Sequence, residues 1–261
     1  MATSESCTSR PLRCRSILAS HQGAPDKTPD RIAGMFDAIA PRYDLLNHLL
    51  SAGIDRRWRA RAIRSLQLTG RETLLDVCTG TADVALAARR GGAARVLGVD
   101  FAGAMLALGR RKVDAAAESQ RIALVRGDAM RLPARDASVD AATVAFGIRN
   151  VQKPEIACEE MARVLKPGGR LAILEFGLPR LPGMRSVYLW YFNRVLPAIG
   201  RLISRHTAAY TYLPASVGTF PPPAEFVTIL RHHGFSEIRA VPLTFGIVYL
   251  YVARRTQGNS P

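Results

Sequence analysis

Short apolar runs alternate with amphipathic stretches along most of the chain from residue 73 onward. Apolar runs with helical patterns on either side are typical of parallel strands that are buried on both faces. We predict seven strands, at Thr73–Cys78, Ala94–Val99, Ile122–Arg126, Val139–Phe146, Leu171–Phe176, Phe235–Val241 and Phe245–Ala253. Their alternation with helices predicts the α/β class, with a doubly wound and mostly parallel seven-stranded sheet.

Apolar residues at helical spacing predict the elements between these strands. Residues 30–66 carry an apolar face with the i, i+3, i+4, i+7 period, which we expect Pro41 and Gly53 to interrupt. Asp55 and Asp83 are each expected to cap a helix. The other predicted helices are Val84–Arg90, Phe101–Glu118, Pro154–Val164 and residues 221–233.

The same patterns divide the chain into two tails, a helical segment and a main domain. Residues 1–29 are rich in Ser, Thr and Arg without an apolar period, so we expect a disordered tail, with an organelle transit peptide as the alternative. Residues 30–70 form an N-terminal helical segment, residues 71–254 the main domain, and residues 255–261 a second tail. Within the main domain, we expect residues 178–220 to form a lid.

The turn after the first strand and the end of the second strand together suggest a nucleoside site. Gly80 lies in a loop of small residues, where the absence of a side chain lets the backbone approach a ligand. Asp100 ends the second strand and is placed to accept hydrogen bonds from both hydroxyls of a ribose. An ordinary strand–turn–helix unit is the alternative for this pattern.

The composition of the loop bears on which nucleoside it binds. A dinucleotide site needs three glycines so that a pyrophosphate can sit on the helix N-terminus, but this loop has one glycine, and Asp83 occupies the place of the pyrophosphate. A carboxylate there repels phosphate and suits a cationic ligand. The pattern therefore favours S-adenosylmethionine, which has a ribose, an amino group and a sulfonium but no phosphate.

Polar residues follow the third and fourth strands as well. Asp128 is placed to accept from the exocyclic amine of adenine, and the backbone N–H of Ala129 is placed to donate to a ring nitrogen. Arg149 and Asn150 follow the fourth strand, and ligands of open α/β sheets bind beyond the carboxyl ends of strands, so we expect these two to face the reacting group. In the N-terminal helices, Tyr43, Asp44 and Asn47 either line the mouth of the site or form a surface cluster.

The chain is strongly basic, with a formal net charge of +15 over 261 residues. Such a charge suggests an anionic lipid, a nucleic acid or an acidic substrate as partner, although an Arg-rich chain can also simply be basic. The four cysteines have no metal-ligand spacing, so we expect no metal. We find no apolar run long enough to cross a membrane.

The expected lid differs in composition from the rest of the chain. No acidic residue occurs between Glu175 and Glu225, whereas arginines and aromatic residues are frequent there. This composition suits a lid over an apolar substrate beside an anionic membrane, and it also suits RNA binding by base stacking. An additional packed pair of helices is the third interpretation.

Four stretches carry a resemblance to a known family, and they read FDAIAPRYDLLNHLLSAGIDRRW, LLDVCTGTAD, FGIRNV and RVLKPGGRLAILEF. From about residue 35 to residue 253, the chain resembles the C-methyltransferases of demethylmenaquinone and ubiquinone biosynthesis. The resemblance implies a Rossmann-like methyltransferase fold that binds S-adenosylmethionine. It assigns contacts with this donor to Thr81, Asp100, Asp128, Ala129 and Ala145, the last standing where the family often has Ser, and the loop pattern adds Gly80.

The resemblance also implies a reaction, the transfer of a methyl group to a ring carbon of a prenylated quinol. The expected acceptor is demethylmenaquinol, with a polyprenyl methoxybenzoquinol of ubiquinone biosynthesis, an RNA or another small molecule as alternatives. Arg149 would stabilise the quinolate and Asn150 would orient the ring oxygen or a water. We expect a cytoplasmic protein on the inner face of an anionic membrane, without nucleic acid, and a homodimer is a further expectation.

Overall fold

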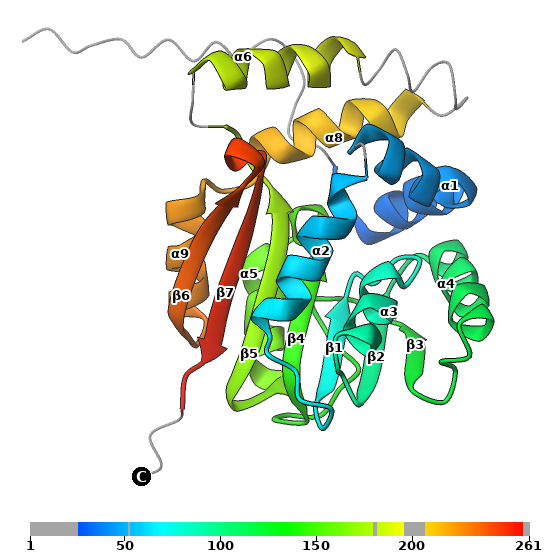
Figure 1. Ribbon diagram of the computed structural model, residues 1–261. Helices are drawn as coiled ribbons and strands as arrows, with labels where there is room; N and C mark the ends of the chain where they lie inside the picture. Colours follow the sequence, from blue (N-terminus) through cyan, green and yellow to red (C-terminus); the bar gives the residue numbers. More distant parts are fainter. Residues whose placement is uncertain (1–25, 52, 180–181, 196–206, 258–261) are drawn as a thin grey trace, which may run out of the picture.

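The computed structural model describes residues 26–51, 53–179, 182–195 and 207–257, and these build one central sheet with helices on both faces (Figure 1). The seven strands run in the order β3-β2-β1-β4-β5-β7-β6, and only β7 is antiparallel to its neighbours. Their bounds are β1 Thr73–Val77, β2 Arg95–Asp100, β3 Ile122–Arg126, β4 Val139–Ala145, β5 Leu165–Phe176, β6 Phe235–Leu243 and β7 Val248–Arg255. The predicted doubly wound, mostly parallel sheet is confirmed.

The helices lie in two layers and across one end of the sheet (Figure 1). They are α1 Pro29–Leu50, α2 Ile54–Ser65, α3 Asp83–Arg90, α4 Gly103–Ala115, α5 Pro154–Val164, α6 Pro182–Trp190, α8 Thr207–Thr219 and α9 Pro223–His232, with short turns η1 Ile148–Asn150, η2 Tyr191–Val195 and η3 Thr244–Gly246. Helices α2 and α3 pack on one face, and α5 and α9 on the other. Helices α6 and α8, from the segment expected to be a lid, lie across the carboxyl ends of the strands (Figure 1).

Burial on both faces explains why the central strands are apolar runs. Along β1, Leu74 joins the hydrophobic cluster under α2 and α3, whereas Leu75 and Val77 join the cluster under α5 and α9. All three side chains are fully buried. Successive side chains of a strand point to opposite faces, so a strand covered on both sides is apolar at most positions. The exception in β1 is the buried Asp76, whose carboxylate accepts a hydrogen bond from the Thr79 hydroxyl at 2.6 Å.

The N-terminal helix departs from the sequence prediction, because α1 continues through Pro41 without interruption. A proline inside a helix removes one backbone hydrogen bond and costs about 3 kcal/mol, which packing must offset. Helix α1 packs on α4, with Ala40 buried. Asp37 of α1 also accepts a hydrogen bond from the backbone N–H of Ala104 at 2.8 Å, so it caps a helix whose own N-cap, Ala102, cannot do so.

The predicted caps at Asp55 and Asp83 are wrong in detail. The residues at the N-caps of α2 and α3 are Gly53 and Ala82, both with left-handed backbone conformations, and the two aspartates lie in the first helical turns. Both carboxylates instead bind Arg59, at 3.2 Å from Asp55 and 2.7 Å from Asp83. The guanidinium of Arg59 is thus the partner of both carboxylates, in place of the backbone N–H groups that the sequence predicted.

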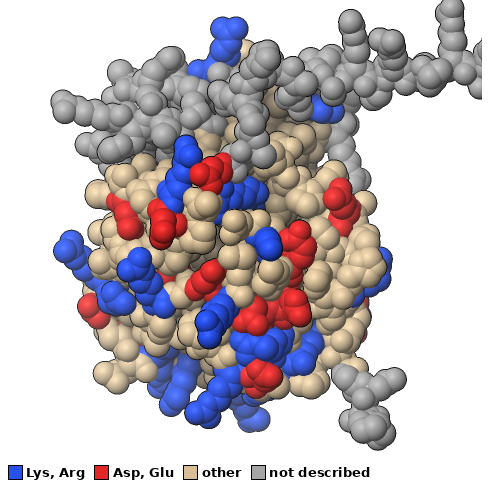
Figure 2. Space-filling model, turned by 180° about the vertical axis from the view of Figure 1, so that it is seen from behind, with Lys and Arg blue, Asp and Glu red and all other residues tan. Residues whose placement is uncertain are grey.

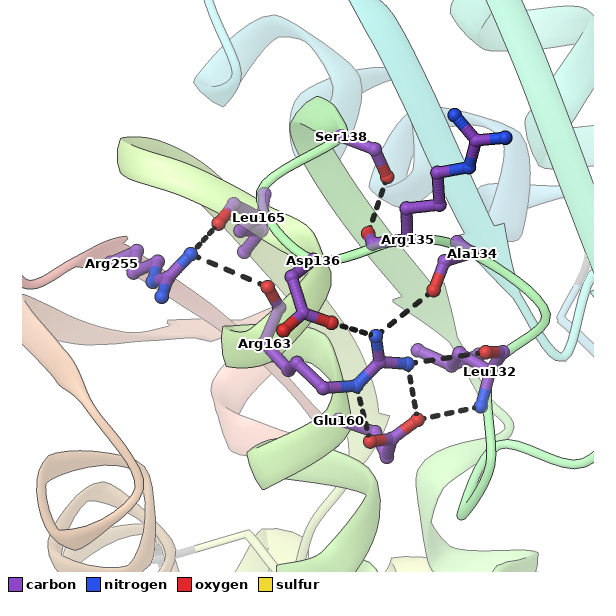
Figure 3. Close-up of polar contacts among 9 residues, drawn as sticks. All are labelled: Leu132, Ala134, Arg135, Asp136, Ser138, Glu160, Arg163, Leu165 and Arg255. Atoms are coloured by element: carbon purple, nitrogen blue, oxygen red, sulfur yellow. Dashed lines mark hydrogen bonds and ion pairs between the residues drawn. The ribbon is translucent and has the colours of Figure 1, made fainter.

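Arg163 of α5 anchors the loop that leads into strand β4 (Figure 3). The guanidinium of Arg163 donates to the carbonyl oxygens of Ala134 at 3.0 Å and Leu132 at 3.2 Å in the loop that precedes β4. It also pairs with Asp136 and Glu160, and the hydrogen bond from Arg163 lowers the pKa of Glu160. This cluster fixes the loop between β3 and β4 against α5.

The buried carboxylate of Glu72 offers a test of how the first and fifth strands are held together. Burial disfavours its ionised form, but hydrogen bonds from Thr69 and from Arg170 of β5 outweigh burial and lower its pKa from 4.5 to about 2. We expect Glu72→Gln to lower the free energy of unfolding by roughly 2 kcal/mol at pH 7. The stabilisation by the Glu72 carboxylate is present above its unfolded pKa and is lost as pH falls from 4.5 through about 2. The free energies of unfolding of wild type and Glu72→Gln should therefore become equal in acid.

Urea unfolding at several pH values measures this difference, with the exposed Glu159→Gln as the control for the loss of one charge. A constant difference between wild type and Glu72→Gln across the acidic range would show that the carboxylate is not ionised in the folded protein.

Candidate functional site

The order of the sheet reverses between β1 and β4, and a small cavity lies at the carboxyl ends of these strands. Ligands of open α/β sheets bind where the strand order reverses. The cavity is lined from the strand ends by Gly80, Asp100, Ala145 and Asn150, and its opposite wall contains Phe36 and Tyr43 of α1, and Met105 of α4. Four predicted site residues therefore meet in one place.

Asp100 is held in place by the backbone on either side of the cavity. Its carboxylate accepts hydrogen bonds from the N–H of Gly80 at 2.8 Å and of Ala102 at 2.9 Å. Burial raises the pKa of Asp100, and these two N–H groups oppose that rise. Gly80 has a positive φ of 55°, which a residue without Cβ adopts at little cost. The chain thus fixes a buried acceptor beside a backbone turn.

Thr81 lies on a polar network behind the loop rather than on the cavity wall. Its hydroxyl donates to Asp44 of α1 at 2.6 Å, and Lys112 of α4 contacts Asp44 at 2.9 Å and Thr81 at 3.2 Å. Lys112 also pairs with Asp83. Asp83 is therefore neutralised by Arg59 and Lys112, which corrects the expectation of a bare carboxylate that repels phosphate. Asp44 belongs to this network, and the side chain of Asn47 lies outside the described residues.

The two residues after β3 make local contacts. Asp128 accepts a hydrogen bond from the N–H of Met130 at 2.9 Å and pairs as an isolated bridge with Arg131. Ala129 is buried against the core. Neither residue lines the cavity described above. Their contacts with a cofactor stay a prediction.

Arg149 is almost completely buried and forms an ion pair with Glu175 of β5. Its Nη1 donates to Glu175 Oε1 at 2.8 Å and to the carbonyl oxygen of Phe146 at 2.5 Å, and its backbone N–H donates to Oε2 at 3.2 Å. Its Nε donates to the hydroxyl of Ser216 at 3.3 Å. The guanidinium of Arg149, which was expected to face a substrate, therefore pairs mainly with Glu175. Its Nη2 is the one nitrogen without a hydrogen-bond partner among the described residues.

The turn that presents Arg149 and Asn150 is tightly constrained. Phe146 has a positive φ of 60°, a conformation that is costly for a bulky residue. A Cβ on Gly147 would lie 2.3 Å from Cβ of Cys78, so only glycine allows η1 to approach the end of β1 so closely. Asn150 is buried, and its Oδ1 has no hydrogen-bond partner among the described residues. An orphaned buried acceptor of this kind calls for a ligand.

Three residues around Arg149 were not singled out from the sequence. Glu175 is fully buried, Ser216 of α8 is fully buried, and Lys27 precedes α1. Burial lowers the pKa of Lys27, and the nearby charge of Arg149 lowers it further. Glu175 had one detectable signal, because an acidic residue at the carboxyl end of a strand beside β4 falls on the predicted ligand edge.

The cavity in this conformation measures about 30 Å³. Sites for small molecules and cofactors measure roughly 300–1,000 Å³, so a nucleoside needs more room than these walls leave. Phe36 and Tyr43 of α1 narrow it, with their rings in edge-to-face contact at 5.9 Å between centroids. A larger cavity of about 580 Å³ lies between α2 and α3, lined by arginines, but it contains none of the predicted site residues.

Candidate metal ligands and thiols occur in the part of the chain that the structure describes, residues 26–51, 53–179, 182–195 and 207–257. There, no group of His, Cys, Asp and Glu side chains could hold a metal ion. Burial raises the pKa of the Cys158 thiol to about 12 and also raises the pKa of the Cys78 thiol. Neither cysteine has the lowered pKa of a nucleophilic thiolate.

Comparisons with solved structures agree with this architecture. The [4+2]-cyclase SpnF has a TM-score of 0.68 at 19% sequence identity, and the match covers 91% of this chain and all of that one. A putative S-adenosyl-L-methionine-dependent methyltransferase from Methanococcus maripaludis has a TM-score of 0.59 at 17% identity, covering 93% of this chain and all of that one. Identities this low establish the fold alone.

Comparisons of sequence are more specific. The "Ubiquinone/menaquinone biosynthesis C-methyltransferase UbiE" of Geobacter sp. (strain M21) is 47% identical over 228 residues, which cover 87% of this chain and 97% of the relative. The "Demethylmenaquinone methyltransferase" of Thermus thermophilus is 47% identical over 222 residues, which cover 85% of this chain and all of the relative. The model of the ubiE/COQ5 methyltransferase family matches residues 25–255. The chain therefore belongs to the ubiE/COQ5 methyltransferase family.

Proposed function

We propose that this protein transfers a methyl group from S-adenosylmethionine to a ring carbon of a prenylated quinol, with demethylmenaquinol as the acceptor. Family membership and the names of the relatives support the reaction class. The observation that carries the proposal is the Arg149–Glu175 pair beside the unpartnered Oδ1 of Asn150, at the carboxyl end of β4. Relatives named for ubiquinone as well as menaquinone biosynthesis make a polyprenyl methoxybenzoquinol the second candidate acceptor.

The residues around the small cavity fit the chemistry of the methyl donor. Asp100 offers a buried carboxylate to the two ribose hydroxyls, and a negative charge also favours a nearby sulfonium. Phe36 and Met105 offer apolar surface for adenine. In this proposal Gly80 and Ala145 line the donor, Asp128 and Ala129 bind the adenine edge, and Thr81 shapes the loop from behind.

Methylation of carbon requires electron density on the ring. Removing the proton of a ring hydroxyl makes the neighbouring ring carbon nucleophilic, and this carbon forms its bond to the methyl group as the bond from methyl to sulfur breaks. The ring carbon then loses its own hydrogen as a proton, which restores the aromatic ring. Arg149 cannot take the first proton, because a guanidinium is already protonated and has no acceptor. In this proposal its Nη2 instead stabilises the quinolate oxygen, while Asn150 accepts from a ring hydroxyl or a water.

Substitution of Arg149 tests its proposed role. We expect Arg149→Ala to slow single-turnover methylation of a short-chain demethylmenaquinol by roughly 10²–10³-fold and to spare donor affinity, since the quinolate forms only during the reaction. Arg149→Lys should rescue little because it loses the planar guanidinium whose Nη1 and Nε contact Glu175 and Ser216 at the same time. Arg95→Ala, which removes an exposed arginine at the other end of β2, is the control. Near-normal turnover in folded Arg149→Ala would remove Arg149 from the chemistry.

Substitution of Asp100 tests the proposed donor site. We expect Asp100→Ala to weaken S-adenosylmethionine binding by about 1.5–3 kcal/mol, the loss of charge-assisted hydrogen bonds to the ribose. Titration calorimetry measures the affinity, and Asp114→Ala on the exposed surface of α4 is the control. Unchanged affinity in a folded Asp100→Ala protein would exclude Asp100 from the site.

We also propose that the protein binds reversibly to the inner face of an anionic membrane through the lid end. In the described residues no helix is both long and apolar enough to span a bilayer. Val187 and Trp190 of α6 are 60% and 61% exposed, and Phe245 of η3 is 65% exposed. On the face in Figure 2, Lys and Arg are interspersed with Asp and Glu. In this proposal the three exposed apolar side chains insert into the membrane.

Liposome flotation tests this surface. We expect the combined substitution of Val187, Trp190 and Phe245 by Ser to reduce binding to anionic vesicles about tenfold or more, because each exposed apolar side chain contributes on insertion. The partly exposed Val125→Ser, on β3, is the control. Rising salt should weaken the remaining binding. Equal flotation of the triple variant and wild type would contradict the assignment.

A further inference from the structure

Helix α8 turns two polar side chains toward η1, the turn that presents Arg149. Tyr212 and Ser216 are four residues apart, so they lie on the same face of the helix. The fully buried Ser216 hydroxyl accepts from Arg149 Nε at 3.3 Å and donates to the Leu213 carbonyl oxygen at 3.0 Å. The contact of Ser216 fixes the position of this helical face against the guanidinium.

The hydroxyl of Tyr212 differs from that of Ser216 because it is buried without a hydrogen-bond partner among the described residues. Burial raises the pKa of Tyr212 to about 12, and the charges of Arg149 and Glu175 both reach the phenol. The side chain therefore stays protonated at neutral pH and keeps a donor to offer. Native proteins rarely leave a buried hydroxyl without a hydrogen-bond partner. A bound ligand would supply that partner for Tyr212, because α8 lies over the carboxyl ends of the strands (Figure 1).

Two unsatisfied groups thus lie beside the same ion pair. Oδ1 of Asn150 is an acceptor, the hydroxyl of Tyr212 is a donor, and each lacks a partner among the described side chains. They come from two different elements, since Asn150 belongs to η1 and Tyr212 to α8, whose Ser216 contacts Arg149 of η1. A quinol hydroxyl offers the complementary pair, because it can donate to an amide oxygen and accept from a phenol.

We propose that Tyr212 is a further catalytic residue of the quinol site, whose hydroxyl donates a hydrogen bond to the ring oxygen of the acceptor as that oxygen becomes a quinolate. The inference rests on the proposed function. It gives α8 a chemical role, because the donor is in place only when this helix lies over the strand ends. The hydrogen bond from Tyr212 also keeps a lone pair of the ring oxygen engaged while the neighbouring carbon attacks the methyl group.

Tyr212→Phe removes one oxygen and keeps the ring that packs in the lid. We expect single-turnover methylation of a short-chain demethylmenaquinol to fall about 10- to 100-fold. Affinity for S-adenosylmethionine should not change. The urea midpoint should stay the same or rise, because the hydroxyl has no hydrogen-bond partner among the described residues. In addition, the pH at which the rate is half-maximal should move upward, since the quinolate loses a hydrogen-bond donor.

Tyr191→Phe is the matched control, because it is another half-buried tyrosine of the lid segment whose pKa is raised by burial alone. Its turnover should remain within twofold of wild type. If wild type methylates the quinol and Tyr212→Phe keeps a normal rate and pH profile, the role of Tyr212 is overturned while the proposed function stands. A Tyr212→Phe protein that is markedly less stable would also overturn it, because the hydroxyl would then be structural. Failure of wild type to methylate any quinol would overturn both.

Discussion

The ion pair between Arg149 and Glu175 is buried beside helix α8, and the arrangement of the site depends on it. Burying two charges is costly, and the pair is tolerated because its groups are also hydrogen-bonded, Glu175 by the backbone N–H groups of Arg149 and Phe176 and Arg149 by Phe146 and Ser216. Loss of either partner would leave an uncompensated buried charge. Through these bonds, one carboxylate on β5 fixes both the turn after β4 and the helix that covers it.

A second constraint acts on the donor side of the crevice. Asp44 of α1 binds Thr81 and Lys112, and Asp37 caps α4, so α1 is attached to the loop and the helix that border the cavity. The space beneath it measures only about 30 Å³. Helix α1 thus borders the small cavity, whereas α8 contacts Arg149 through Ser216.

The sheet could be predicted from the sequence because each central strand is a buried apolar run, and the end of each strand marks the ligand edge. This reasoning found Asp100 and Asn150, which line the cavity. It missed Glu175, because a pairing between residues 26 positions apart leaves no periodic signal. It also expected breaks and caps at Pro41, Asp55 and Asp83, where tertiary contacts outweigh local preference. Helix propensities and capping preferences describe one segment of the chain by itself. The conformations of these residues depend instead on contacts with other elements.

In the proposed reaction, groups around the ion pair hold the ring oxygen so that carbon receives the methyl group. A quinolate can react at oxygen or at the neighbouring carbon, and hydrogen bonds to the oxygen from Arg149 and Tyr212 would suppress the first path. The most direct measurement incubates the protein with S-adenosylmethionine carrying a ¹³C-labelled methyl group and a short-chain demethylmenaquinol. NMR of the extracted product then locates the label. We expect the labelled methyl on a ring carbon beside a hydroxyl-bearing carbon, whereas a methyl ether, or a ring without label, would contradict the proposed reaction.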